Sequence, residues 1–428
     1  MPKKYNYIIA GYYFLLLIFL ISWKSPDVAP PTPLRLAFIA AMVLPAIIKY
    51  QDWMTPVVIC FTAISRYSFS FSYLPYEIGI IAFVMIVCAM LVNVRRPYKN
   101  MVPKYLITLI LYTFLVDVVS DGSILPITYS LVIIISFFFF VNFKTDFAYK
   151  HISLAFCIAS VVLSILFLTT RNQYAVVYGE WNAGLERSGW TDPNYFGMAI
   201  GMGCVAASIM LFSVKNNLLM KSAYLATIGL SLIASVLNAS RGAILSITFS
   251  MVLLLFFSKV KTRYKTYVII LTVIFLVYLL NNGYFELLEY RIQNDSGGGG
   301  GRLEIWGQKL SAYFEDGNLL NILFGYGGDY GANHLAVKLS MKTTGSHNDF
   351  VAFFVNYGPI GLFLLLYLLF TPFYNFWKYQ RKNVPLLAAS VYLILCCLTL
   401  EPLAFGHLPF FAFIFYTIVI SRYYEQKI

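Results

Sequence analysis

Apolar runs of membrane-spanning length recur along almost the whole chain, and they constrain its fold more than any other feature of the sequence. A helix needs about 17 to 25 residues to cross ~30 Å of hydrocarbon, and most of the runs approach or reach that length. Of the 428 residues, 60% are hydrophobic and 12% are charged, whereas soluble domains carry about 25% charged residues. The runs do not show the alternating pattern of barrel strands. The sequence therefore predicts an all-α, polytopic membrane protein.

We assign about fourteen candidate spans, and twelve or thirteen remain possible because the second and third are short. The spans cover residues 7–23, 34–48, 55–64, 78–94, 105–120, 125–143, 152–169, 196–214, 223–238, 243–258, 267–280, 350–370, 386–400 and 408–420. No small-residue cleavage site follows the first span, so we expect it to remain in the mature protein.

The distribution of basic residues favours one orientation of these spans. Lysine and arginine gather on the cytoplasmic side of membrane proteins, and most of the 31 basic residues fall on that side if the N-terminus is cytoplasmic. The sequence thus predicts one membrane domain over residues 1–428, with extracytoplasmic loops at 171–193 and 281–348. Most of the net charge of +12 then comes from basic residues on the cytoplasmic side, which anionic lipid of the inner leaflet attracts. We expect no nucleic-acid partner, because no soluble module carries a basic patch.

The six cysteines lie within or against apolar spans, with neither CxxC nor Cys/His ligand spacing. Such cysteines act as small core hydrophobes. The sequence also contains no Walker loop and no dinucleotide fingerprint. We therefore expect no disulfide framework, no metal site and no nucleotide cofactor, so the energy for any reaction has to come with its substrate.

The longest polar stretch, 281–348, holds the largest group of candidate site residues. These are Arg291, Arg302, Glu304, Trp306, His347 and Asn348. Five consecutive glycines at 297–301 make a fixed backbone costly, so we expect a segment that is mobile or that orders with substrate. The apolar spacing within 303–314 predicts an interfacial helix that lies on the membrane.

Two further candidate regions lie at the same predicted face. The loop 171–193 ends in a turn-rich string that contains Arg187 and Asp192, and residues 238–243 form a tight polar turn around Arg241. An arginine at membrane depth is costly unless it faces a cavity and has a partner. A snorkelling interfacial arginine is the alternative interpretation of Arg241.

External arginines suit a phosphate ligand, because the guanidinium group stays charged and binds phosphate through two parallel hydrogen bonds. A set such as Arg187, Arg241 and Arg302 can hold the diphosphate of a lipid-linked sugar, whose departure drives transfer of that sugar. The acceptor hydroxyl needs a base. His347 is the candidate, since its unperturbed pKa is ~6.5. A histidine that only caps the following span is the alternative interpretation.

Several short motifs follow one another at the predicted outer face. They are Arg187 with Asp192-Pro193-Asn194, Ser240-Arg241-Gly242, Gly301-Arg302-Leu303-Glu304-Ile305-Trp306, Gly325-Tyr326-Gly327, Ser346-His347-Asn348-Asp349 and Tyr357-Gly358-Pro359-Ile360-Gly361. In this order and spacing they resemble the Wzy/WaaL superfamily of O-antigen polymerases and O-antigen ligases. The resemblance covers roughly residues 187–365, and the N-terminal third adds no motif to it.

The resemblance implies a role for each of these residues. Arg241 and Arg302 match the family arginines that bind the donor diphosphate, and His347 matches the histidine implicated in activating the acceptor. Supporting contacts are implied for a further set, namely Arg187, Arg291, Trp306 and Asn348. Asp192 and Glu304 either orient the arginines, assist the base, or are acids at helix starts. The family is metal-independent, which implies a reaction without cofactors.

The resemblance further implies a GT-C type glycosyltransferase of the bacterial inner membrane, with cytoplasmic termini and a periplasmic active site. We expect an O-antigen polymerase that transfers an undecaprenyl-diphosphate-linked glycan onto the next lipid-linked repeat unit during lipopolysaccharide biosynthesis. A polysaccharide chain-length regulator is the protein partner that a polymerase implies. A ligase that transfers the glycan to lipid A-core is the first alternative. A flippase for lipid-linked oligosaccharides is a lesser one, because repeated halves are not evident in the sequence.

Overall fold

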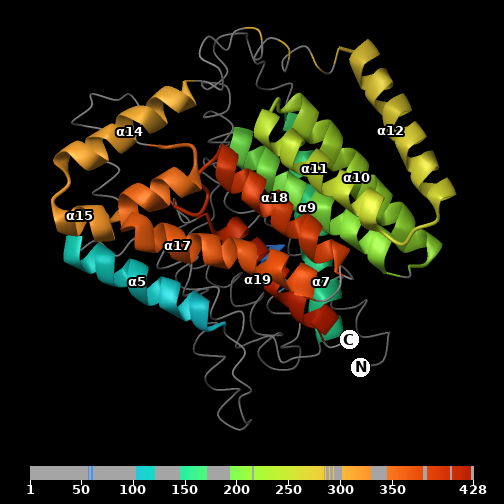
Figure 1. The fold of residues 1–428 in the computed structure, drawn as a ribbon. Coiled ribbons are helices and arrows are strands. Elements are labelled where there is room, and N and C mark those ends of the chain that lie inside the picture. The colour runs from blue at the N-terminus through green and yellow to red at the C-terminus, as the bar shows by residue number, and fades with distance from the viewer. Residues whose placement is uncertain are drawn as a thin grey trace, which may run out of the picture.

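The computed structural model describes residues 103–120, 145–170, 193–214, 216–283, 301–328, 345–378, 383–404 and 407–425, with a few isolated positions besides. All regular elements within these ranges are helices (Figure 1). The predicted spans at 7–23, 34–48, 78–94 and 125–143, and almost all of 55–64, lie outside the described residues. The all-α prediction is confirmed for the part of the chain that the structure describes.

The helices keep the order of the predicted spans. They are α5 (Lys104–Ser120), α7 (Thr145–Thr170), α9 (Pro193–Ser213), α10 (Leu218–Leu237), α11 (Arg241–Phe257), α12 (Thr262–Asn281), α14 (Arg302–Asp316), α15 (Leu319–Phe324), α17 (Asp349–Lys378), α18 (Val384–Thr399) and α19 (Leu408–Glu425).

Four of these helices are long and apolar enough to cross a membrane. The qualifying stretches are Tyr149–Thr169 in α7, Asn194–Ser213 in α9, Leu218–Leu237 in α10 and Asp349–Lys378 in α17. Shorter apolar helices are formed by α11, most of α12, and α18. Large apolar side chains on the outside of these helices, such as Phe256, Ile274 and Phe363, remain exposed, as a lipid-facing surface requires. The chain is therefore an all-α polytopic membrane protein.

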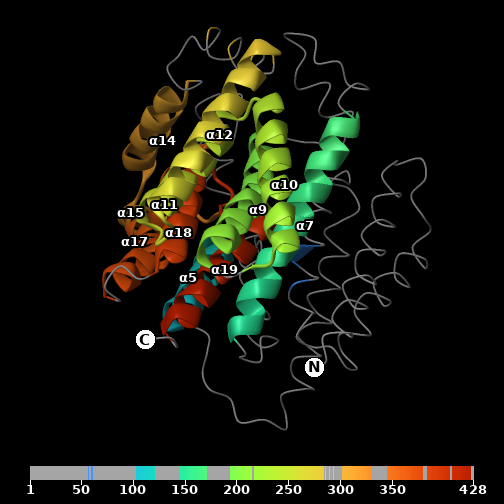
Figure 2. The same ribbon diagram turned by 90° about the vertical axis from the view of Figure 1, so that its right-hand side faces the viewer.

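The described helices form two groups joined by α18 and α19 (Figures 1 and 2). One group packs α7, α9, α10 and α11 against one another, and the other packs α5, α14 and α15 against α17. Helix α18 contacts α9 and α11 on one side and α17 on the other, while α19 packs on α7. Helix α12 stands at the edge of this assembly, with most of its apolar side chains exposed. Elements from both groups thus meet at the end of α18.

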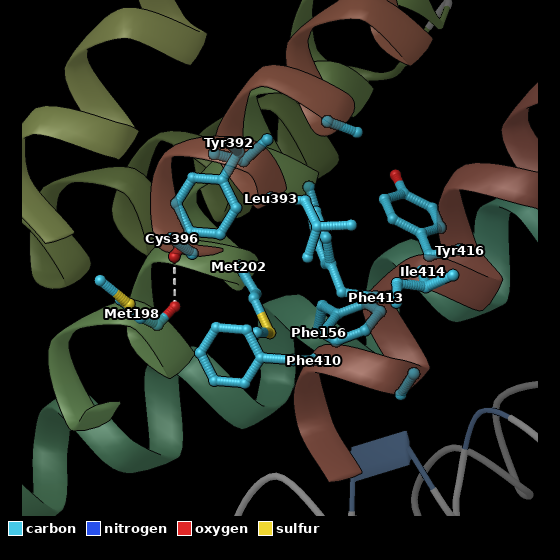
Figure 3. Close-up of a cluster of buried hydrophobic side chains, with 14 of the residues drawn as sticks. Phe156, Met198, Met202, Tyr392, Leu393, Cys396, Phe410, Phe413, Ile414 and Tyr416 are labelled. Carbon is cyan, nitrogen blue, oxygen red and sulfur yellow. Dashed lines mark hydrogen bonds between the residues drawn. The ribbon is translucent and has the colours of Figure 1, made fainter. Parts of the chain in front are cut away.

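Aromatic side chains fill the core where α7, α9, α18 and α19 meet (Figure 3). Phe413 lies between Phe156, with ring centroids 5.3 Å apart, and Tyr392, at 5.4 Å. The Tyr392 hydroxyl donates to the Met198 carbonyl, as the dashed line in Figure 3 marks. That hydroxyl lies against Gly201, where a β-carbon would overlap it. Small residues therefore let α18 approach α9 closely, as is usual between membrane helices.

Helix α17 is interrupted at Gly358, where φ is +65°, in the left-handed region that favours glycine. Pro359 follows, and it has no N–H to donate to the Val355 carbonyl one turn earlier. The released carbonyls find other donors: Val355 accepts from Tyr326 N–H at 3.2 Å, Asn356 from Gly327 N–H at 2.8 Å, and Tyr357 from the Tyr112 hydroxyl at 2.7 Å. The predicted span 350–370 is therefore two helical halves rather than one continuous helix. The Gly325-Tyr326-Gly327 motif is the partner of its break.

The helix predicted at 303–314 is present as α14, and it packs on α17. Its buried side is formed by Lys309, Ala312 and Tyr313, which differs from the predicted apolar stripe. Leu303 and Phe314 of that stripe are 67% and 56% exposed. Both remain available to a membrane surface, although the Phe314 ring also packs against Phe354 of α17, with ring centroids 6.0 Å apart. The difference arises because Tyr313 packs against Tyr326 and Phe354, with ring centroids 5.7 and 5.0 Å away.

Candidate active site

The candidate site is built around the five residues 345–349, the last of which begins α17. This segment lies between α14 on one side and the connection 400–404, which follows α18, on the other. The residues that match the sequence motif Ser346-His347-Asn348-Asp349 are therefore held by two elements distant in the sequence. The predicted polar stretch 281–348 runs from the end of α12 to this segment.

Ser346 uses three groups to fix the segment in place. Its peptide N–H donates to Glu401 Oε2 at 2.7 Å, and its hydroxyl accepts from Lys309 Nζ at 3.0 Å. Its carbonyl accepts from Trp306 Nε1 at 2.6 Å. Trp306, predicted to contact substrate, therefore anchors Ser346 through its indole N–H.

The next two polar residues tie the start of α17 to the connection 400–404. Asn348 Oδ1 accepts from the N–H of Phe350 at 2.8 Å, so Asn348 is the side chain that caps α17. The buried Asp349 carboxylate accepts from the N–H groups of Leu403 and Ala404. Asn348 was predicted as a substrate contact, and in this structure its oxygen serves the helix. The capping interpretation of His347 does not describe the structure, since its neighbour holds that position.

His347 lies between these anchors with φ at +51°, a left-handed conformation that costs a residue other than glycine ~1 to 3 kcal/mol. Its imidazole is half-buried, and within the described residues its buried Nδ1 has no hydrogen-bond partner. Burial, together with the positive charges of Arg302 and Lys309, lowers the pKa of His347 to about 4. The imidazole is therefore neutral at neutral pH.

Glu401 is the carboxylate that faces this histidine segment. It is 3% exposed. Its Oε2 is bound by Ser346, while its buried Oε1 has no hydrogen-bond partner in the part of the chain that the structure describes. Burial raises the pKa of Glu401 to about 7, against the opposing effect of the nearby His347 and Ser346 peptide groups and of Lys309.

Lys309 is the buried cation of the site, with 1% of its surface exposed. Burial lowers the pKa of Lys309, and the negative charge of Glu401 counteracts this effect. A buried ammonium group costs free energy unless it is paired and hydrogen-bonded. Its bond to Ser346 and its proximity to Glu401 provide that compensation.

Arg302 and Glu304 lie at the start of α14 but in different surroundings. Arg302 is the first residue of the helix, after Gly301 with φ +73°, and its charge acts on His347. Glu304 is exposed and accepts from Gln308 Nε2 at 3.1 Å, one turn along the same helix. The charge of Arg302 thus acts on His347, whereas Glu304 is hydrogen-bonded to a glutamine of its own helix.

Arg241 begins α11 at the same end of the bundle. Ser240 caps that helix and its hydroxyl donates to Asn194 Oδ1 at 3.4 Å, at the start of α9. A β-carbon on Gly242 would lie 2.8 Å from Thr399 Oγ1, so the turn abuts the end of α18. Glu401 follows Thr399 by two residues. The described contacts therefore place Arg241 near the connection 400–404, and Arg302 is the arginine that acts on His347.

Three predicted residues, Arg187, Asp192 and Arg291, lie outside the described residues. Two residues of the site were missed as site residues by the sequence analysis, namely Lys309 and Glu401. Glu401 is the only acidic residue from 386 to 420. An acidic residue between two apolar spans marks a functional candidate, and that signal was present in the sequence.

Comparison with known families gives one result for this region. Residues 226–366, from within α10 to within α17, match the family model described as O-antigen ligase, Wzy_C. This match over about a third of the chain supports the Wzy/WaaL superfamily. This confirms the resemblance read from the motifs, and members of the family are glycosyltransferase-like ligases and polymerases that use lipid-linked saccharides. No curated protein matches the chain.

The Wzy/WaaL match contains Arg241, Arg302, Lys309 and His347, while Glu401 lies beyond its last residue. Among the described residues, no group of three or more His, Cys, Asp or Glu side chains is arranged to hold a metal ion. The candidate site therefore combines groups from the matched region with a carboxylate outside it.

Proposed function

We propose that this protein is an O-antigen polymerase, which transfers an undecaprenyl-diphosphate-linked glycan onto the next lipid-linked repeat unit. The observation that supports this proposal most directly is the placement of a neutral His347 beside the cations Arg302 and Lys309, at the start of α17. All three lie within the region that matches the O-antigen ligase family model. A transfer from a lipid diphosphate needs positive charge for the leaving group and a neutral polar group for the acceptor.

On the donor side, we assign the diphosphate to Arg302 and Arg241. Both side chains lie at the starts of helices, α14 and α11, where the helix dipole adds to their attraction for an anion. Their guanidinium groups stay charged and bind phosphate with fork geometry. Arg187 and Arg291 are supporting candidates. As the bond to the sugar breaks, these cations stabilise the negative charge that develops on the diphosphate.

On the acceptor side, we assign His347 to contact the incoming hydroxyl. A neutral imidazole accepts a hydrogen bond, and the pKa of about 4 keeps it neutral throughout the physiological range. Trp306, Asn348 and Ser346 keep the segment in one position through the bonds described above. Such preorganisation removes the cost of ordering the site during the reaction.

The proposed membrane orientation places this site on the periplasmic face of the inner membrane, with both termini in the cytoplasm. It follows from the basic residues near the span ends. The proposed fold type is GT-C. A chain-length regulator is the protein partner that this function implies.

The test is to incubate the purified protein in detergent with undecaprenyl-diphosphate-linked repeat units alone and to follow product size. A ladder of longer lipid-linked glycans is the expected result. Absence of a ladder, with transfer only after addition of lipid A-core, would instead identify an O-antigen ligase, which needs the same donor site.

A flippase for the same lipid-linked oligosaccharides is the lesser alternative. Detergent solution has no second compartment, so a carrier would leave the glycan unchanged there. Absence of any product with either acceptor, together with movement of the lipid across reconstituted vesicles, would favour the carrier and contradict both transferases.

A further inference from the structure

The Glu401 carboxylate has one oxygen fixed and one oxygen left over. Oε2 accepts from the Ser346 peptide N–H at 2.7 Å, and the buried Oε1 has no hydrogen-bond partner within the described residues. Buried polar atoms are hydrogen-bonded in the great majority of cases, and an exception in a native protein calls for an explanation. A group from a substrate is one explanation, because it supplies the missing partner only when it is bound.

Gly345 makes the position of this oxygen possible. A β-carbon at residue 345 would overlap Glu401 Oε1 and would also lie 3.6 Å from His347 Cε1. The unpartnered carboxylate oxygen and the imidazole therefore both lie against Gly345. His347 contributes a second buried atom without a partner, Nδ1, among the groups that the structure describes.

The two groups differ in their ability to take a proton. A general base works best when its pKa lies near the working pH. His347, with a pKa of about 4, binds a proton weakly because burial disfavours the imidazolium and because Arg302 and Lys309 repel it. Glu401, with a pKa of about 7, is the stronger base of the two at neutral pH, because burial disfavours its charged form.

We propose that Glu401 is the proton acceptor of the transfer reaction, and that His347 orients the acceptor hydroxyl beside it without taking the proton. This inference rests on the proposed function. The acceptor hydroxyl gives its proton to Glu401 Oε1 as its oxygen bonds to the anomeric carbon of the donor sugar. The bond from that carbon to the diphosphate breaks, and its electron pair leaves with undecaprenyl diphosphate. Glu401 then releases the proton to water.

The charged groups around Glu401 set the pH dependence expected of this base. Lys309 from α14 favours the carboxylate, whereas Asp349 from α17 and the burial of the site oppose it. Arg302 and His347 complete the set, the first as a cation near the imidazole. Since Glu401 must be deprotonated to act, kcat/KM should fall tenfold per unit as the pH decreases below about 7.

The test measures glycan extension by the full-length wild type, Glu401→Gln and His347→Asn from pH 5 to pH 9, with donor binding measured on the same samples. Glu401→Gln keeps an oxygen for the Ser346 N–H and removes the base. It should lower kcat about 10²- to 10⁴-fold and abolish the acid limb near pH 7, while donor binding is retained. Glu401→Asp should recover part of the activity, and the acid limb of its pH–rate profile should lie at a different pH from that of the wild type. His347→Asn should be slower than the wild type but keep the acid limb.

Two controls separate this role from a structural one. Glu315→Gln changes an exposed acid of α14 and should leave rate and pH profile unchanged. The thermal midpoint of Glu401→Gln in detergent should not fall below that of the wild type, so loss of turnover is not loss of fold.

The inference would be overturned by a Glu401→Gln variant that keeps its rate within a few-fold and retains the acid limb. It would also be overturned by loss of that limb in His347→Asn, which would make His347 the base. In both cases an active wild type leaves the proposed function standing. A wild type without transferase activity would overturn the proposed function and, with it, the role of Glu401.

Discussion

The two ends of the first half of α17 handle departures from helical backbone in opposite ways. At its C-terminal end, the break at Gly358 releases backbone carbonyls, and Tyr326, Gly327 and Tyr112 each donate a hydrogen bond to one of them. Just before its N-terminal end, His347 adopts a left-handed conformation. Buried atoms of His347 and Glu401 have no hydrogen-bond partner within the described residues. An irregular backbone whose polar groups are all hydrogen-bonded has a structural role. One that keeps buried polar atoms without hydrogen bonds is suited to bind a ligand.

The largest effect should come from the arginines that the proposal places on the diphosphate. Arg302→Ala and Arg241→Ala should each lower glycan extension by at least about 10²- to 10³-fold, because each removes a charge that stabilises the leaving group. Membrane insertion and thermal midpoint should be unchanged. Arg263→Ala, at the start of α12, is the matched control. Full activity in both site variants would contradict the diphosphate assignment.

The next effect concerns the stability cost of the site. Burial raises the pKa of Glu401 from 4.5 to about 7. Between these two pH values, Glu401 is therefore ionised in the unfolded chain but still protonated in the folded protein. Wild-type stability should therefore decrease as the pH rises from 4.5 to 7 and then level off. Glu401→Gln should not show this decrease, and above pH 7 it should be the more stable protein by roughly 3 kcal/mol at 1.36 kcal/mol per pKa unit. Unfolding curves at pH 5 and pH 8 measure the difference. An equal pH dependence of the unfolding free energy in the two proteins would mean that burial does not raise the pKa of this carboxyl group.

At the other end of the comparison, Gly358→Ala should affect stability more than catalysis. The added β-carbon overlaps the Leu323 carbonyl, and the φ of +65° is unfavourable for alanine. We expect a loss of ~1 to 3 kcal/mol in the free energy of unfolding. The kcat of the protein that remains folded should stay within a few-fold of the wild type. Gly307→Ala, at a helical position with open space around it, is the matched control and should not lose stability. A kcat reduced as strongly as in the arginine variants would remove the distinction between the two ends.

Gly345→Ala should affect catalysis more than stability, the reverse of the result expected for Gly358→Ala. Its β-carbon would overlap Glu401 Oε1, so the carboxylate has to move away from the space it shares with His347. Turnover should fall about tenfold to a hundredfold, since a displacement of ~1 Å at a reacting group costs up to about 10²-fold. The thermal midpoint should change little. A normal rate would show that the position of this oxygen is not critical.

The smallest effect is expected from Tyr112→Phe. It removes the Tyr112 hydroxyl, which donates to the Tyr357 carbonyl at 2.7 Å. Loss of a neutral hydrogen bond of this kind costs ~0.5 to 1.5 kcal/mol. Activity should be unaffected. Tyr374→Phe, with an exposed ring on α17, should be neutral in the same denaturation experiment.

The sequence was sufficient for the class of fold, because each apolar run needs a helix to satisfy its backbone in lipid. It was less informative about ends and interruptions. Helix α7 begins at Thr145 rather than near residue 152, and α17 continues to Lys378 rather than ending near residue 370. The break at Gly358 was not predicted as a break, because a glycine and a proline inside an apolar run do not reveal whether partners for the freed carbonyls are nearby.

The order of the motifs predicted that Arg302 and His347 belong to one site, and this assignment stays a prediction. In the structure, the charge of Arg302 contributes to the lowered pKa of His347. The pairing of Ser346 with Glu401 and Lys309 was not predictable, since it joins residues separated by 55 and 37 positions. Periodicity reports which face of a helix is apolar. It does not report which connection folds back over the start of another helix.

The break at Gly358 also bears on how the site tolerates different membranes. Bilayers vary in thickness, and a spanning helix responds mainly by changing its tilt. A continuous α17 would transmit such a tilt to His347 and its neighbours. With the break in place, the second half of α17 can adjust its angle while the first half stays attached to α14 and to the connection 400–404. We expect the chemistry at the membrane surface to be insulated from the thickness of the lipid beneath it.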